Sequence, residues 1–316
     1  MAQTETDTGR TEPSFLNRDY TSFLRGMCMM MILFSHTANE FTDLLAQYHL
    51  NGMLVCGRFA TGIFFFLSGY GLTLSVHRNK IDSSYVCRHL RNLLCPYIIF
   101  WLFYFLTGLC AGHFPSAHAV LFTDFLLLKM PDADAWFFRT ILGVYIVYFA
   151  MARFMKPYSG TGVAVLIVLY VSVLAISGVS DWWWNTVLCF PVGILYANYP
   201  HVLSKRLPLK GFVVIACLFV VCYRFVPFHL VRAILPPVIC CLFFASLSLR
   251  VSVPKKESVI GFMGRNSLYV YFMEAIPIDY MDSEEVGLFV FVLGSMLATL
   301  VLTYVGKSVE RLCLRR

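Results

Sequence analysis

Charged residues are scarce in this sequence, and their scarcity excludes most classes of soluble protein. Only 14% of the 316 residues are Asp, Glu, Lys or Arg, whereas 59% are hydrophobic, and the mean hydropathy is +0.70. A typical soluble domain has about 25% charged and about 45–50% apolar residues. The apolar residues therefore exceed what a soluble core requires, and the sequence indicates an integral membrane protein.

Patterns typical of metal sites, disulfide frameworks and signal peptides are also missing. The 11 cysteines include no CxxC pair and no Cys/His spacing of a zinc site, and most lie in apolar runs. We expect small buried side chains rather than disulfides or metal ligands. Residues 1–19 lack the apolar stretch and cleavage site of a signal peptide, which predicts a flexible cytoplasmic tail. No repeat relates the two halves, which weakens an interpretation as a transporter.

The sequence does contain long apolar segments, each close to the roughly 20 residues that span a bilayer as a helix. They cover residues 20–39, 53–76, 93–111, 136–155, 161–177, 182–197, 211–227, 230–249, 264–280 and 286–306. We therefore expect an all-α, polytopic membrane bundle of about ten transmembrane helices over residues 20–306, followed by a basic cytoplasmic tail over 307–316. Pro191, Pro236, Pro237 and Pro277 lie inside these segments, where a kink or a break is expected.

The distribution of charge predicts the orientation of the chain. The net charge is +7, and most Lys and Arg residues fall in one alternating set of loops, whereas acidic residues such as Asp132 and Asp181 fall in the other. Basic loops remain on the cytoplasmic side, so we expect both termini to be cytoplasmic. This pattern favours membrane lipids over nucleic acid as partners. We expect a multi-pass integral membrane protein, located in a bacterial cytoplasmic (inner) membrane. Homo-oligomer formation is left open.

Ionisable residues inside apolar segments cost on the order of 2.5–3.5 kcal/mol each, so each is a candidate for function. Arg25 and His36 are 11 residues apart, which places them on one helix face with a rise of about 16 Å. Either residue alone is also explained by helix packing or by a side chain that reaches toward the interface. The topology places a further group in the outer layer with His36: Arg58, Trp136, Arg139 and Glu274.

A basic stretch, HRNKIDSSYVCRHLRNLLCP, follows the second apolar segment. Arg88 and Arg91 are three residues apart on an expected helix, a spacing that suits a phosphate clamp on the cytoplasmic side. Contact with anionic lipid is the alternative explanation of the same charges.

Five motifs occur in a fixed order: LRGMCMMMILFSH (24–36), ATGIFFFLSGYGL (60–72), YVCRHLRNLLCPY (85–97), AWFFRTILGVYIVYF (135–149) and FMGRNSLYVYFMEAI (262–276). In the first, Arg25 is followed by ten residues and then His36. Together the motifs resemble the membrane acyltransferase 3 family, the R-x10-H integral membrane O-acyltransferases, over nearly the whole chain. Many members have a histidine after the last motif where this sequence has Glu274, which puts the role of that histidine in question. The sequence resembles the form without an SGNH esterase-like domain.

The resemblance implies transfer of an acyl group, usually acetyl, from cytoplasmic acyl-CoA to a hydroxyl of a carbohydrate or cell-surface glycan, with no bound cofactor and no metal. His36 and Arg25 are then the catalytic pair, with His36 as a base because imidazole ordinarily titrates near pH 6.5. The remaining expected roles are oxyanion stabilisation by Arg58 or Arg25, orientation of His36 by Glu40 or Glu274, binding of acyl-CoA by Arg88, Arg91 and Ser68, and acceptor contacts by Trp136 and Arg139. Direct transfer and an acyl-histidine intermediate both remain open. The rival hypotheses are a secondary transporter or exporter of a lipid-linked or small sugar, and a membrane sensor without catalytic activity.

Overall fold

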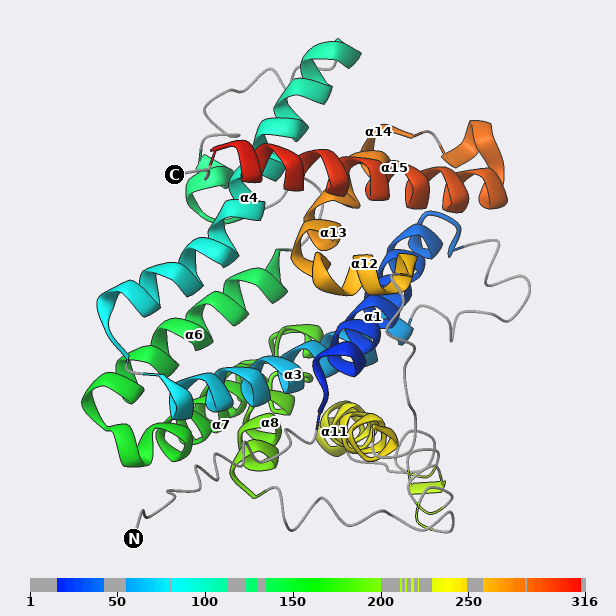
Figure 1. The fold of residues 1–316 in the computed structure, drawn as a ribbon. Helices are drawn as coiled ribbons and strands as arrows, with labels where there is room; N and C mark the ends of the chain where they lie inside the picture. Colours follow the sequence, from blue (N-terminus) through cyan, green and yellow to red (C-terminus); the bar gives the residue numbers. More distant parts are fainter. Residues whose placement is uncertain are drawn as a thin grey trace, which may run out of the picture.

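The computed structural model describes residues 16–42, 55–79, 81–112, 123–129, 135–199, 229–248, 258–281 and 283–313, together with five isolated positions between 211 and 221. Its helices are α1 (Arg18–Asn39), α3 (Cys56–Arg78), α4 (Ser83–Ala111), α6 (Trp136–Phe154), α7 (Ser159–Ile176), α8 (Cys189–Asn198), α11 (His229–Leu247), α12 (Val259–Arg265), α13 (Ser267–Met273), α14 (Ala275–Tyr280) and α15 (Ser283–Cys313). Two 3-10 helices, η2 (Lys156–Tyr158) and η3 (Asp181–Trp183), precede α7 and α8. No strand occurs in these ranges, which confirms the all-α expectation (Figure 1).

Six helices within the described residues are long and apolar enough to cross a membrane. They are α3, α4, α6, α7, α11 and the part of α15 from Gly287 to Cys313. The total of about ten transmembrane helices and the cytoplasmic location of both termini remain predictions. The apolar segment expected at 211–227 falls largely outside the described residues. Helix α15 continues to Cys313, so most of the basic segment expected as a tail from residue 307 is helical.

Two expected spans are divided into short pieces, and a proline lies in the last piece of each, whereas Pro236 and Pro237 lie inside the undivided helix α11. Segment 182–197 consists of η3, a series of turns and the short helix α8, and segment 264–280 consists of α13 and α14, preceded by α12. Proline has no N–H, so Pro191 and Pro277 cannot donate to the carbonyls four residues earlier, those of Val187 and Met273. The second division places Glu274 at the junction of α13 and α14.

Helix α3 lies at the centre of the bundle and packs against α1, α8 and α11. Its contact with α8 is a close approach of two backbones. A Cβ atom at Gly69 would overlap the Phe190 carbonyl, and a Cβ atom at Gly193 would overlap the Phe66 carbonyl. Small residues of this kind allow helices in membranes to gain packing contacts at short separation.

A second close approach joins α1 to α12. A Cβ atom at Gly26 would overlap the Ile260 carbonyl, and one at Gly264 would overlap the carbonyl of Ser22. The two glycines therefore allow α1 to lie directly on the divided segment, as Figure 1 shows for the blue and orange helices. This contact positions His36 of α1 relative to Glu274.

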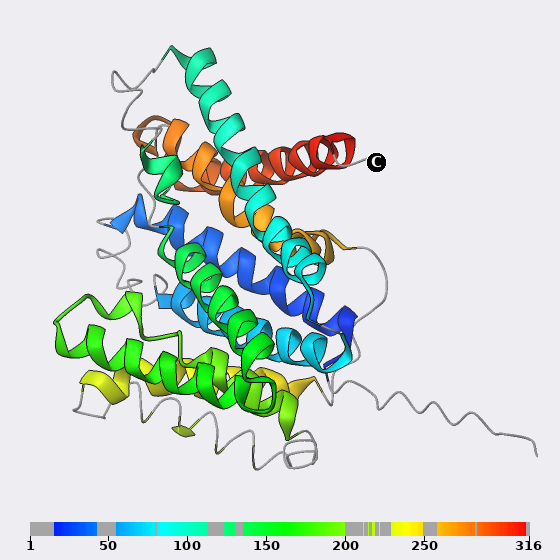
Figure 2. The same ribbon diagram turned by 90° about the vertical axis from the view of Figure 1, so that its left-hand side faces the viewer.

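The outer surface of the bundle is apolar. Helix α7 exposes Val165, Leu166, Val168, Leu169 and Val173, and α15 exposes Phe289, Val290, Leu297 and Val301. In both ribbon views α15 and α11 lie on opposite sides of α1 (Figure 2). Apolar side chains on the outside, with backbone hydrogen bonds satisfied inside helices, suit a hydrocarbon environment.

Candidate active site

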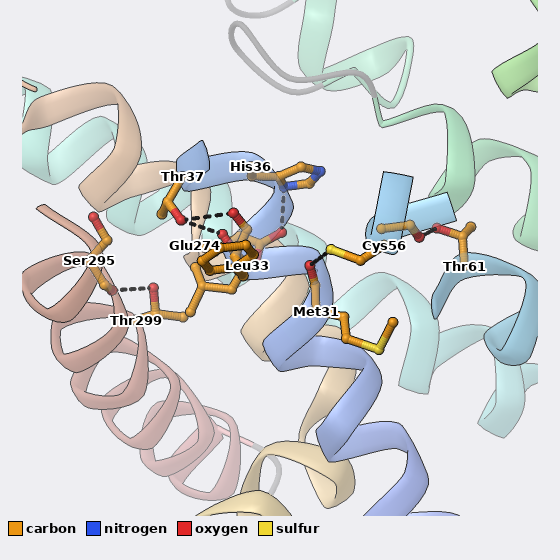
Figure 3. Close-up of polar contacts among 11 residues, drawn as sticks. Met31, Leu33, His36, Thr37, Cys56, Thr61, Glu274, Ser295 and Thr299 are labelled. Atoms are coloured by element: carbon orange, nitrogen blue, oxygen red, sulfur yellow. Dashed lines mark hydrogen bonds and ion pairs between the residues drawn. The ribbon is translucent and has the colours of Figure 1, made fainter. Parts of the chain in front are cut away.

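His36 and Glu274 form a hydrogen-bonded pair between the last turn of α1 and the α13/α14 junction. The Nδ1 atom of His36 lies 2.9 Å from Oε1 of Glu274, as Figure 3 shows. An ionised carboxylate only accepts hydrogen bonds, so Nδ1–H is the donor and Nε2 is the nitrogen with a free lone pair. This arrangement leaves Nε2 available to accept a proton from a substrate.

The two members of the pair differ strongly in their access to the surroundings. The His36 side chain is 42% exposed, whereas that of Glu274 is 2% exposed. The second oxygen of Glu274, Oε2, has no hydrogen-bond partner among the described residues. A buried carboxylate whose one hydrogen bond is to an imidazole suits the orientation of that imidazole and the stabilisation of its protonated form.

The end of α1 is held in place by local hydrogen bonds. The Thr37 hydroxyl lies 2.9 Å from the Leu33 carbonyl and 3.1 Å from the Phe34 carbonyl. The Cys56 thiol, at the start of α3, lies 3.3 Å from the Met31 carbonyl (Figure 3). The Thr37 contacts lie within α1, and the Cys56 contact joins α1 to the start of α3; none of them uses the imidazole.

Arg25 lies three turns from His36 on α1, in a second polar group. Its guanidinium interacts electrostatically with the Tyr145 hydroxyl of α6, and that hydroxyl is within hydrogen-bonding reach of Ser68 on α3. Side chains from α1, α3 and α6 therefore converge at this depth. The sequence singled out Arg25 and Ser68 but missed Tyr145, because no local pattern distinguishes it from the other aromatic residues of α6.

Arg58 forms an ion pair with Asp181, the first residue of η3. Its Nη2 atom lies 3.2 Å from Oδ2 of Asp181, and the His229 Nε2 atom lies 4.0 Å from the same oxygen. The residue before Arg58 is Gly57, whose Cβ position would lie 3.0 Å from the Ser35 hydroxyl. Arg58 thus belongs to the helix turn next to His36, while its charge is paired with Asp181.

Trp136 and Arg139 lie in an aromatic cluster with η3. The Trp136 ring centroid is 6.1 Å from that of Trp182 and 6.4 Å from that of Trp183. The Arg139 guanidinium carbon lies 5.0 Å from the Trp183 ring centroid, within the range of a cation–π interaction. Because Asp181 adjoins Trp182, the structure brings Arg58, Trp136 and Arg139 together around η3.

The other predicted site residues occupy separate positions. Glu40 is exposed at the C-terminal end of α1, and the Nδ1 atom of His36 is taken by Glu274 instead. Arg88 and Arg91 are exposed near the start of α4. Ser68 is not beside them but deeper, with Tyr145.

One residue links the start of α4 to the Arg25 group. The Tyr85 hydroxyl lies 2.6 Å from the Ser75 hydroxyl, and Tyr85 also interacts electrostatically with Tyr145. Polar side chains therefore extend from the turn that bears Arg88, through Tyr85 and Tyr145, to Arg25. In the ranges that the structure describes, no three His, Cys, Asp or Glu side chains are placed to hold a metal ion.

Comparison with known protein families gives a match that includes every site residue described above. Residues 18–307 match a family described as an acyltransferase domain. The match begins at the first residue of α1 and ends near the end of α15. Two further comparisons, one with curated proteins and one with solved structures, find no match.

Proposed function

Because the chain belongs to this acyltransferase family, we propose that it is a membrane O-acyltransferase that moves an acetyl group from cytoplasmic acetyl-CoA to a hydroxyl of a carbohydrate or cell-surface glycan. The observation that supports this most strongly is the hydrogen bond between His36 and the buried carboxylate of Glu274. Attack of an alcohol on a thioester requires removal of the hydroxyl proton, and a histidine held in one tautomer by a carboxylate is suited to that task.

In the proposed reaction, Nε2 of His36 accepts the proton of the acceptor hydroxyl as its oxygen attacks the thioester carbonyl. A carbon–oxygen bond forms and the carbonyl oxygen becomes an oxyanion. When the intermediate collapses, the carbon–sulfur bond breaks and the leaving thiolate takes the proton from the imidazolium. The products are the O-acyl ester and free coenzyme A, and His36 returns to its starting state.

The two intramembrane arginines have different parts in this proposal. Eleven residues of α-helix separate Arg25 from His36 by about 16 Å, which is too far for both to act on one carbonyl. We assign Arg25, with Tyr145 and Ser68, to the donor arm on its way from the cytoplasm. Arg58 adjoins the His36 turn and is assigned to the oxyanion, with Asp181 holding its guanidinium in place.

The acceptor is assigned to the opposite, outer side. Trp136, Trp182 and Trp183 present partly exposed rings there, and aromatic faces beside charged groups suit the apolar faces and the hydroxyls of a sugar. The proposed location is the bacterial inner membrane, with the donor side facing the cytoplasm. In this arrangement the donor arrives from one face of the membrane and the acceptor from the other, and the acyl group passes directly between them beside His36.

Purified protein incubated with radiolabelled acetyl-CoA tests the proposal. Release of free thiol together with label on an added glycan, or on the protein itself, supports an acyltransferase. A transporter of small or lipid-linked sugars is the second candidate, since divided helices such as α12 to α14 are typical of transporters. That candidate predicts sugar flux in proteoliposomes with no consumption of acetyl-CoA.

A further inference from the structure

Arg139 carries a positive charge that no carboxylate balances within the described residues. It lies half-buried in the first turn of α6, a helix long and apolar enough to cross a membrane. Its guanidinium forms no ion pair or hydrogen bond with any residue that the structure describes, and its Nε atom is buried without a partner. A charged side chain in a membrane span is costly and normally has a partner or a function. A ligand is therefore the expected source of the missing counter-charge.

Arg58, the other arginine of the cluster around η3, differs from Arg139 in this respect. Its Nη2 atom lies 3.2 Å from Oδ2 of Asp181. The Nε2 atom of His229 lies 4.0 Å from the same oxygen. Two basic side chains thus already surround the carboxylate of η3. Asp181 compensates the charge of Arg58, and no ion pair links it to Arg139.

The ring of Trp183 holds the Arg139 guanidinium by one face. The guanidinium carbon lies 5.0 Å from the ring centroid, and the Tyr170 hydroxyl lies 3.4 Å from the Trp183 carbonyl, which ties η3 to α7. A ring that covers the face of a guanidinium leaves the N–H donors in its plane uncovered. Donors in this planar arrangement bind a carboxylate through two parallel hydrogen bonds. Arg139 is therefore suited to bind a carboxylate.

Two further tryptophan rings lie beside this group. The ring centroids of Trp136 and Trp182 are 6.1 Å apart, with their planes at 83°, and that of Trp182 is 5.3 Å from that of Trp183. Both Trp136 and Trp182 are partly exposed. Aromatic rings with an accessible face suit contact with the apolar face of a sugar ring. The site thus combines ring faces with a cation that lacks a carboxylate partner among the described residues.

This site adjoins the residues to which the chemistry is assigned. Arg58 pairs with Asp181, the first residue of η3. The Cβ position of Gly57, the residue before Arg58, would lie 3.0 Å from the hydroxyl of Ser35, the residue before His36. A substrate bound on η3 therefore lies beside the helix turns that bear the proposed base and the proposed oxyanion group.

We propose that the acceptor is an acidic sugar, and that Arg139 binds its carboxylate while Trp136 and Trp182 pack against its ring. The inference rests on the proposed function, because it names the class of acceptor for that reaction. A carboxylate supplies the counter-charge for Arg139, which a neutral sugar does not. The headgroup of phosphatidylglycerol offers similar charged oxygens, but it has no ring to cover the tryptophan faces.

The test compares two sugars that differ in one group. Methyl β-D-glucopyranosiduronic acid has a carboxylate where methyl β-D-glucopyranoside has a hydroxymethyl group. Saturation-transfer NMR titration of purified full-length protein, without acetyl-CoA, gives the Kd of each. We expect the acid to bind about 10-fold or more tightly, because hydrogen bonds between ionised groups contribute more than neutral ones. The galactose and mannose forms of both probes are measured in the same way.

Variants of Arg139 separate recognition of charge from packing. Arg139→Gln should abolish the preference by weakening the acid alone, with the Kd of the neutral sugar unchanged. Trp182→Leu should weaken both sugars equally. Arg153→Gln, which removes an exposed arginine near the other end of α6, is the matched control and should keep the preference. If Arg139→Gln fails to fold, Arg139→Lys decides the question, because loss of the planar donors should reduce the preference several-fold.

Four results would overturn the proposal. They are equal binding of acidic and neutral sugars to the wild type, an unchanged preference in Arg139→Gln or Arg139→Lys, the absence of binding by every acidic probe, and competition by short-chain phosphatidylglycerol for a site that no acidic sugar occupies. Asp132 and Asp134 lie outside the described residues. A preference that appears only after Asp132→Asn or Asp134→Asn would show that the chain itself compensates Arg139, which also contradicts the proposal.

The binding experiment is independent of acyl transfer. A preference for acidic sugars in a protein that transfers no acetyl group would contradict the proposed function and leave this site standing. Acetyl transfer to neutral glycosides, without binding of the acidic ones, would do the reverse.

Discussion

The Nδ1 atom of His36 and the Oε1 atom of Glu274 lie 2.9 Å apart although 238 positions separate them in the chain. The contact joins the last turn of α1 to the junction between α13 and α14. In the proposed mechanism this contact lets Glu274 orient His36, at the position where many members of the family that the sequence resembles have a histidine. A carboxylate here can hold the imidazole in one tautomer, which a second neutral imidazole does less strongly.

We expect Glu274→Gln to lower kcat by on the order of 100-fold, because the amide keeps the volume and loses the charge that stabilises protonated His36. Glu40→Gln is the matched control, since Glu40 is exposed on the same end of α1, and it should leave kcat unchanged. Steady-state kinetics with acetyl-CoA measures both. A larger loss for Glu40→Gln than for Glu274→Gln would reassign the orienting role.

Tyr145→Phe should raise the KM for acetyl-CoA about 2- to 10-fold with a small change in kcat. The substitution removes one hydroxyl from the group that also includes Arg25 and Ser68, and a neutral hydrogen bond contributes about 0.5–1.5 kcal/mol. Tyr148→Phe, whose hydroxyl lies 3.0 Å from the Thr73 hydroxyl on α3, is the control on the same helix. Equal effects of the two substitutions on KM would remove Tyr145 from the donor path.

Several of the long helices could be predicted from the sequence because a continuous apolar run of this length favours a helix. The segments expected at 20–39, 53–76, 136–155, 161–177 and 230–249 match α1, α3, α6, α7 and α11 within a few residues. The divided segments could not be placed in the same way. Pro191 and Pro277 predict a disturbance, but the loss of one backbone donor does not determine whether a helix kinks or separates into pieces.

The sequence predicted most residues of the candidate site, but it did not predict which of them contact one another. Topology placed His36, Arg58 and Glu274 in one layer, but depth in the membrane does not determine which helices are neighbours. The close approach of Gly26 to Ile260 decides that α1 packs on α12, and this packing brings Glu274 to His36. Tyr145 was missed because its importance depends on neighbours from two other helices.

We expect replacement of both Arg88 and Arg91 by Gln to raise the KM for acetyl-CoA about 10-fold with a modest change in kcat. Groups that bind the donor equally in the ground state and the transition state affect KM alone. Added salt should reproduce part of the effect on the wild type, because exposed charges are screened over about 10 Å at 0.1 M. Arg153→Gln, an exposed arginine near the end of α6, is the control.

Oriented vesicles distinguish donor binding from an effect on membrane insertion. An unchanged KM for the Arg88 and Arg91 double variant in the correctly oriented fraction, together with a larger misoriented fraction, would assign both arginines to topology alone.

Fusions of a reporter that is active only in the periplasm should be inactive at both ends of the chain. This expectation follows from the excess of Lys and Arg in one alternating set of loops. A fusion in the loop that contains Asp132 and Asp134 should be active and serves as the positive control. Activity of either terminal fusion would contradict the predicted orientation and the assignment of Arg88 and Arg91 to the donor side.

The central claim is that His36 is the base, and the most direct test is the rate of acetyl transfer by purified His36→Ala protein. Removal of the imidazole leaves the buried Glu274 carboxylate without its one hydrogen-bond partner among the described residues, so the melting temperature of the variant is measured alongside its rate. Loss of a general base should lower kcat at least about 100-fold at saturating acetyl-CoA. Asn39→Ala, in the same turn of α1, should keep wild-type kcat. Transfer by folded His36→Ala protein at a rate close to that of the wild type would contradict the account.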